Sequence, residues 1–257
     1  MKKLFNKNII KKSLIIVGTI SIMIVLFFAV RQRSASNIDS VKVILESNNP
    51  VKLIGEEDVL TFLQKATRKN IKNQDIRNIN IEEIEMLLDK SRYIKNSEVY
   101  IGTNGVFTIH CVLNDPIMRV SGMQSEDFYF DADGNIIPLS QRAACRVPLL
   151  SGNLRIIDFN NMQKKGSNAN VILDIGKKLS EDVFLSALIE QIYIENNGKL
   201  ILIPKVGHQK LEFGGLTNVD EKLDKIKVFY KSGMAGAGWK KFNRINLEWE
   251  GQVVGSS

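Results

Sequence analysis

Residues 13–30 form an unbroken run of 18 uncharged, mostly apolar residues near the beginning of a chain that is otherwise polar and mixed. Twelve members of the run are Leu, Ile, Val or Phe. As an α-helix the run would be about 27 Å long, close to the thickness of the hydrocarbon core of a bilayer. Its apolar side chains favour insertion by about 5 kcal/mol in total. The sequence therefore predicts one transmembrane helix over residues 13–30.

The charges on either side of this run predict its orientation. Five lysines and no acidic residue precede it, whereas Arg31 and Arg33 follow it. Positive charge in short flanking segments stays on the cytoplasmic side. We therefore expect residues 1–12 to be a cytoplasmic tail, residues 31–37 a short polar tether, and the remainder to lie outside the membrane. This is the topology of a single-pass type II protein of the cytoplasmic (inner) membrane.

A cleaved signal peptide is the alternative interpretation of the same run. The apolar region of a signal peptide usually has about 7–15 residues and is followed closely by a small-x-small cleavage site. Here the apolar run is longer, and the nearby candidate site, Ser34-Ala35-Ser36, lies beyond two arginines. The sequence favours an uncleaved anchor.

The net charge of +7 has its source mainly in the same region. Outside the first 30 residues the chain has 30 basic and 28 acidic residues, which leaves a net charge of +2. A nucleic-acid-binding domain usually concentrates basic residues on one surface, and no such concentration is seen. We expect no nucleic-acid partner.

Metal-binding patterns are weak in this sequence. His110 and Cys111 are neighbours on an expected strand, where adjacent side chains point to opposite faces and cannot easily share one ion. His208 lies in a turn-like stretch. Residues 131–135 (Asp-Ala-Asp-Gly-Asn) resemble the start of a calcium loop but lack the glycine and glutamate spacing of an EF-hand, so they favour a hairpin. We expect no metal and no cofactor.

Catalytic motifs are also missing from the sequence, which has no GxSxG, HExxH or GxxxxGK[ST] pattern. A membrane-anchored hydrolase would need a nucleophile beside a base, and neither histidine has an evident partner. We therefore expect no enzyme activity and no small-molecule substrate. Cys111 and Cys145 form no CxxC motif, and two unrelated small apolar residues are a simpler interpretation than the disulfide that an oxidising compartment would permit.

Residues 38–117 predict a small α+β module. An alternating strand over 41–45 is followed by a helix that opens at Glu56 with acids in its first turn, and by a second helix capped by Asn80. Two strands, 98–101 and 106–113, flank an Asn-Gly turn. The expected order is strand, helix, helix, strand, strand.

Residues 118–254 predict a β-rich domain with about two helices, followed by a tail over 255–257. We expect a hairpin from strands over 128–130 and 136–137, and further strands over 192–195, 199–203 and 244–254. The helices are expected over 180–191 and from Val219 to Tyr230. The last strand is a natural sheet edge, beside which Trp239, Phe242 and Trp249 are candidate anchors for a protein partner or, alternatively, core residues.

The order of several short segments resembles that of the FtsQ/DivIB family of bacterial division proteins. Each segment is only moderately specific, and their succession along the chain carries the resemblance. The segments are Pro-Ile-Met-Arg-Val at 116–120, Phe-Tyr-Phe-Asp-Ala-Asp-Gly-Asn-Ile-Ile-Pro-Leu-Ser at 128–140, Val-Pro-Leu-Leu-Ser-Gly at 147–152, Lys-Leu-Asp-Lys-Ile at 222–226 and Ile-Asn-Leu-Glu-Trp at 245–249.

This resemblance implies that residues 38–117 are a POTRA domain and that residues 118–254 are an FtsQ-type β-domain. It further implies a non-catalytic scaffold of the divisome at the division septum, which holds the FtsB/FtsL pair while FtsB adds a strand beside the last strand. The partner-binding residues implied by position are Leu247, Glu248, Trp249 and Val253. A different POTRA-bearing component of envelope assembly or secretion is the alternative function.

Overall fold

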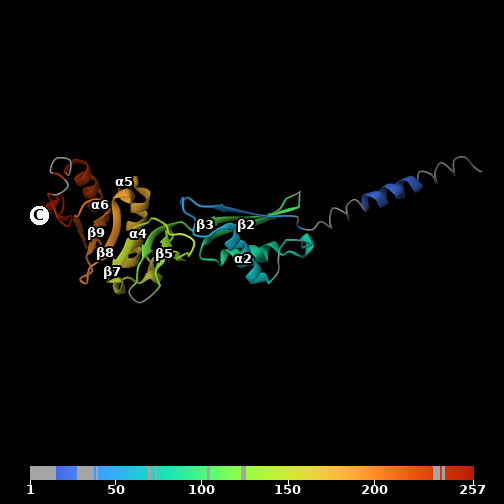
Figure 1. Ribbon diagram of the computed structural model, residues 1–257, viewed down its shortest axis with the longest axis horizontal. Coiled ribbons are helices and arrows are strands. Elements are labelled where there is room, and N and C mark those ends of the chain that lie inside the picture. Colours follow the sequence, from blue (N-terminus) through green and yellow to red (C-terminus); the bar gives the residue numbers. More distant parts are fainter. Residues whose placement is uncertain are drawn as a thin grey trace, which may run out of the picture. The chain divides into compact units, whose positions relative to one another are not determined.

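The computed structural model describes residues 16–27, 38, 40–68, 71–72, 74–102, 105–122, 126–233, 238 and 241–257 (Figure 1). The chain divides into two compact units. The first contains Met1–Ile44, Glu56–Leu88 and Ser97–Cys111, and the second contains Leu45–Gly55, Asp89–Asn96 and Val112–Ser257.

Residues 16–27 are helical, and every side chain in this stretch is exposed. Within the described part of the chain, no helix combines the length and the apolar character that crossing a membrane requires. Several predicted segments lie outside the described residues. They are the cytoplasmic tail (1–12), the two ends of the transmembrane segment (13–15 and 28–30) and the tether (31–37).

The predicted strand-helix-helix-strand-strand order of the first module is confirmed. The elements are β1 (Ser40–Glu46), α2 (Glu56–Thr67), a 3₁₀ turn (Ile76–Asn78), α3 (Ile81–Asp89), β2 (Ile94–Ile101) and β3 (Val106–Leu113). The strands form one sheet in the order β1-β3-β2. Short helices beside a small sheet place this module in the α+β class.

Local signals account for the boundaries of these helices. The backbone N–H of Glu83 donates to Oδ1 of Asn80 at 3.2 Å, which confirms the predicted cap of α3. Val59 and Leu63 of α2 are buried as the helical period requires. The same helical period would also place Phe62 and Ala66 near this face, but both residues are exposed.

The second unit contains a nine-stranded sheet. Its strands are β4 (Pro116–Val120), β5 (Phe128–Asp131), β6 (Ile136–Pro138), β7 (Leu149–Gly152), β8 (Ile189–Ile194), β9 (Leu200–Pro204), β10 (Lys210–Gly214), β11 (Arg244–Asn246) and β12 (Val254–Ser256). Their spatial order is β12-β11-β10-β9-β8-β7-β4-β5-β6. Strands β4, β7 and β8 are parallel to one another, as are β10 and β11, and the other pairs are antiparallel.

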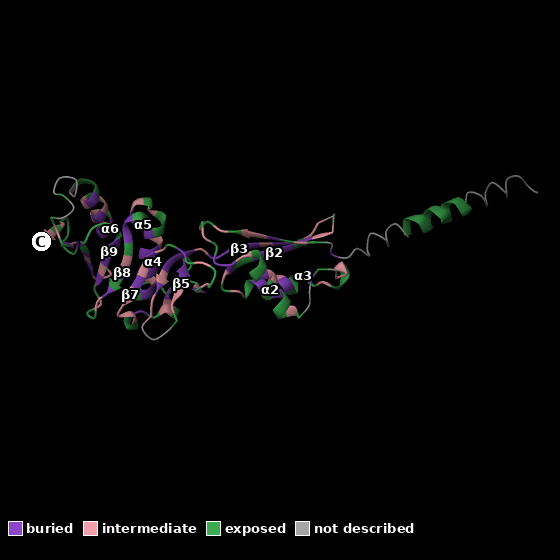
Figure 2. Cartoon of the chain, in the orientation of Figure 1, coloured by how far each residue is buried: buried purple, intermediate pink, exposed green. Residues whose placement is uncertain are grey.

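Three α-helices pack on one face of this sheet. They are α4 (Asn168–Glu181), α5 (Val183–Leu188) and α6 (Val219–Val228), the last of which continues into a π-helical turn (Phe229–Gly233). Their buried residues share one apolar core with a row of strand residues, which are Leu150, Ile192, Leu202, Leu211 and Ile245. In Figure 2 the buried residues lie where these helices meet the strands.

Two predicted elements of this unit differ from the structure. The helix expected over 180–191 is present as the shorter α5, since α4 extends to Glu181, Asp182 separates the two helices, and β8 starts at Ile189. Helix α4 itself was not predicted, so the described unit has three α-helices where about two were expected. Its first turn is rich in Asn, a poor helix former, but Ser167 caps it and six of its residues are buried.

The final strand expected over 244–254 is also wrong. Two three-residue strands, β11 and β12, pair in antiparallel fashion and are separated by residues 247–253. The structure places Gly255 and Ser256, expected in a terminal tail, in β12.

Asp182 allows a direct test of the junction between α4 and α5. Its Oδ1 accepts the N–H groups of Phe184 at 2.9 Å and Leu185 at 3.0 Å, and its Oδ2 lies 3.2 Å from Nζ of Lys227. We expect Asp182→Ala to lower the free energy of unfolding by about 1–2 kcal/mol at neutral pH, because the cap is lost. Asp182→Asn should retain the cap and cost less than about 0.5 kcal/mol. Urea unfolding of the full chain in mild detergent measures both values.

We also expect the stability difference between the wild type and Asp182→Asn to depend on pH. The hydrogen bond from the Leu185 N–H, helped by Lys227, lowers the pKa of Asp182 below its ordinary value. A carboxylate with a lowered folded-state pKa stabilises the protein above its unfolded-state pKa, and this stabilisation is lost as pH falls through the folded-state value. The stability difference between the wild type and Asp182→Asn should therefore shrink below about pH 4. A difference that grows in acid would contradict this assignment.

Candidate functional site

Strand β12 forms one edge of the nine-stranded sheet. It pairs with β11 through Arg244 opposite Ser256, Ile245 opposite Gly255 and Asn246 opposite Val254. On its outer side β12 has no neighbour among the described residues. The unpaired backbone groups of such an edge can accept a strand from another chain.

The four residues proposed from the sequence differ in exposure. Leu247 is fully buried and belongs to the apolar core, whereas Val253 is half-buried and packs against that core. Both carboxylate oxygens of Glu248 lie 3.0 Å from Nζ of Lys199. Trp249 is 63% exposed. A partner therefore has direct access to Trp249 and Glu248, while Leu247 supports the fold beneath them.

Trp249 lies in a turn that connects β11 to β12, formed by residues 247–252 and called the Trp249 turn below. Within it, the N–H of Gln252 donates to the carbonyl oxygen of Trp249 at 3.2 Å. Gly251 has a φ of +64°, a left-handed conformation that glycine adopts without strain. The turn begins beside β10, where the N–H of Leu247 donates to the carbonyl oxygen of Glu212 at 3.0 Å.

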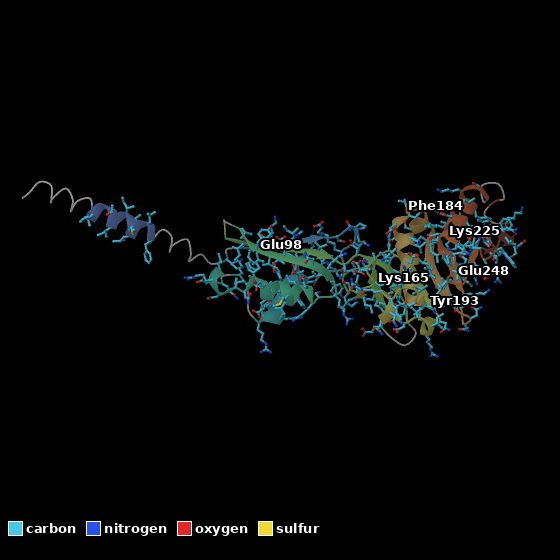
Figure 3. The ribbon with its side chains drawn as sticks, turned by 180° about the vertical axis from the view of Figure 1, so that it is seen from behind. Glu98, Lys165, Phe184, Tyr193, Lys225 and Glu248 are labelled. Atoms are coloured by element: carbon cyan, nitrogen blue, oxygen red, sulfur yellow. The ribbon has the colours of Figure 1, made fainter. Side chains whose placement is uncertain are left out.

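Helix α6 contacts the Trp249 turn through two side chains. Nζ of Lys225 donates to the carbonyl oxygen of Trp249 at 2.6 Å and lies 2.7 Å from Oε1 of Glu221. The same Oε1 accepts the N–H of Gly251 at 3.0 Å. These bonds, first that from Lys225 and then that from Gly251, lower the pKa of Glu221 below its ordinary value. Figure 3 shows Lys225 and Glu248 at the end of the sheet that carries β12.

The sequence did not single out Val254, Glu221 or Lys225 as part of this site. Val254 is 46% exposed on β12, but nothing in its sequence context distinguishes it from a core valine. Glu221 and Lys225 have the i,i+4 spacing of a helical ion pair, which was the available signal. Their contacts with the turn join residues 24 to 30 positions apart and depend on the tertiary fold.

The other two aromatic candidates, Trp239 and Phe242, differ from Trp249. Trp239 lies outside the described residues. The ring of Phe242 lies 6.0 Å from that of Phe229 and covers Gly255, where a Cβ atom would approach Cδ1 of Phe242 to 2.5 Å. Phe242 therefore packs beneath the edge strand.

The expected calcium-like loop forms the β5–β6 hairpin. Oδ1 of Asp131 accepts the N–H groups of Asp133 at 2.9 Å and Asn135 at 2.8 Å, so this carboxylate is directed into its own turn. Over the part of the chain that the structure describes, no three His, Cys, Asp or Glu residues are grouped to hold a metal ion.

The histidines and cysteines are dispersed in the fold. His110 is half-buried in β3, and His208 is exposed in the bend before β10. Cys111 and Cys145 are both buried, and neither is in a disulfide bond.

Comparison with known families agrees with both parts of the fold. A family model described as FtsQ/DivIB, C-terminal related matches residues 115–256, which is more than half of the chain. A model of a POTRA-like domain matches residues 38–111. No curated protein matches the chain.

Proposed function

The chain belongs to the FtsQ/DivIB, C-terminal related family, and from this premise we propose that it is a non-catalytic, membrane-anchored scaffold of the bacterial divisome. During septum formation it recruits and holds single-span division proteins of the FtsB/FtsL type. The observation that carries this proposal is the unpaired edge of β12 beside an exposed tryptophan.

Strand addition at β12 is the binding mode that this edge supports. A partner strand beside residues 254–256 would extend the nine-stranded sheet and satisfy backbone groups of the edge. Trp249 and Val254 would supply exposed apolar contacts next to the added strand. Glu248 and Val253 would border the contact, and Leu247 would act from within the core.

The membrane anchor completes the proposed architecture. Residues 13–30 are uncharged and mostly apolar, and the described part of this run is a helix whose large apolar residues are 51–74% exposed. Such an exposed apolar helix is stable in lipid and unfavourable in water. With residues 1–12 in the cytoplasm, the folded units lie outside the cytoplasmic membrane. Confinement to one membrane raises the effective concentration of single-span partners.

A photo-crosslinking amino acid at Val254 tests this function in native membranes. The full chain should form adducts with small single-span coiled-coil division proteins when the probe replaces Val254. The matched control is a probe at Tyr193 on β8, which is 41% exposed and lies in the same cross-strand row as Val254. Four strand spacings separate the two positions by about 19 Å.

The two probes distinguish the binding modes. Adducts at position 254 and none at 193 support strand addition at the edge. Adducts of equal yield at both positions would indicate a partner lying across the sheet face and would reject the edge model. A lack of division-protein adducts at position 254 would reject the proposed function.

A further inference from the structure

An exposed tryptophan in a connecting turn is usually free to move, because side chains on loops make few contacts. The Trp249 turn differs, because its main chain is bonded at several points while Trp249 itself remains 63% exposed. The turn is therefore ordered by bonds that do not use the tryptophan side chain.

Most of these bonds come from outside the turn. Between its own backbone groups, the described structure shows the bond from Gln252 N–H to the Trp249 carbonyl oxygen. Lys225 holds the carbonyl oxygens of Trp249 at 2.6 Å and Leu247 at 3.4 Å, and Glu221 holds the N–H of Gly251 at 3.0 Å. The ion pair between Lys225 and Glu221 joins these contacts into one unit.

Lys225 has little surface left for a partner. Its side chain is 11% exposed, and its ammonium group is already bonded to two carbonyl oxygens and one carboxylate. Any effect of Lys225 on partner binding must therefore act through the Trp249 turn.

We propose that Lys225 and Glu221 are positioning residues that order the Trp249 turn before a partner arrives. This inference rests on the proposed function of the β12 edge and adds how that edge is prepared for binding. A preordered anchor binds more tightly because its conformational entropy is lost on folding instead of on association. The partner it fits presents an extended strand with an apolar pocket beside it for the indole ring.

Lys225→Met tests the proposal, since it keeps the apolar stem and removes the donor. Lys227→Met is the matched control, because Lys227 is on the same helix and pairs with Asp182 and Asp224 instead of the turn. Both are made in a Trp239→Phe background, in which Trp249 is the remaining tryptophan of the chain. The full chain in lipid nanodiscs, without any partner, is measured by time-resolved fluorescence anisotropy and by amide hydrogen exchange.

Lys225→Met should increase the fast angular motion of Trp249 and accelerate exchange of the Gly251 amide by about tenfold or more. Lys227→Met should change neither value. Lys225→Arg, which retains a charged donor, should restore both toward the wild type. In native membranes the adduct yield of a probe at Val254 should fall several-fold in Lys225→Met alone.

Unchanged anisotropy and exchange in Lys225→Met would overturn the proposal. A mobile turn with an undiminished adduct yield would overturn it as well, because ordering would then be irrelevant to binding. If the wild type forms no adduct, the proposed function fails, whereas the partner-free measurements still decide whether Lys225 orders the turn.

Discussion

Replacing Gly152 with alanine is expected to lower the free energy of unfolding of the nine-stranded unit by about 3–5 kcal/mol. Gly152 ends β7 with a φ of +96°, opposite Ile194 of β8. A Cβ atom at this position would lie 2.2 Å from the carbonyl oxygen of Ile194 and 2.8 Å from its nitrogen. Because both neighbours are backbone atoms of an adjacent strand, the clash is relieved only by separating β7 from β8.

The strained φ and the steric clash can be measured separately. Gly166 has a φ of +82°, and a Cβ atom there would meet nothing within 4 Å. Gly166→Ala should therefore cost only about 1–2 kcal/mol, the conformational penalty of a left-handed alanine. Urea unfolding followed by circular dichroism gives both values for the full chain in detergent. Equal losses for the two variants would show that β8 does not restrict position 152.

Sequence patterns predicted the elements whose signals are local. The first module follows from alternating apolar residues, the Asn80 cap and the Asn-Gly turn, each of which acts within a few residues. The β5–β6 hairpin was predicted for the same reason, since Asp131 bonds to backbone groups two and four residues later. The resemblance to FtsQ/DivIB proteins also came from the order of such short segments.

Elements that depend on tertiary packing were missed. Helix α4 contains Asn168, Asn170 and Gly176, which disfavour a helix when considered alone, and it is stabilised by burial against β4 and β5. A Cβ atom at Gly176 would lie 3.2 Å from Met118 Cε, so this glycine permits the close approach. The helix propensity of the residues in α4 contains no information about the contact between Gly176 and Met118.

For a similar reason, the sequence predicted only part of the candidate site. The sequence indicates a location near the carboxyl end and leaves Trp249 open between a partner anchor and a core residue, but it does not predict the division of residues 244–256 into two strands. Strand β11 ends at Asn246, beyond which Leu247 enters the core and bonds to Glu212 of β10. The entry of Leu247 into the core and the hydrogen bonds from α6 both depend on residues distant in sequence. The four positions inferred by resemblance therefore included the buried Leu247.

Trp249→Ala is expected to reduce partner binding at the β12 edge by about 30-fold or more, equivalent to about 2 kcal/mol. Truncation of an exposed tryptophan that enters a partner pocket removes both apolar contact and shape complementarity. The free protein should unfold as the wild type does, because the indole ring is mostly exposed and its turn is held through backbone atoms. A loss of binding without a loss of stability is the signature that distinguishes an anchor from a core residue.

This prediction has two control variants, Trp249→Phe and Tyr193→Ala. Phenylalanine keeps an aromatic ring on the same ordered turn and should retain part of the binding. Tyr193 is another exposed aromatic residue, but it lies four strands from the edge, and its truncation should leave binding unchanged. Titration of the full chain in nanodiscs with the partner recovered through the Val254 adduct measures the three affinities. If Trp249→Ala binds as the wild type does, the backbone edge alone carries recognition and an ordered Trp249 turn has no role in it.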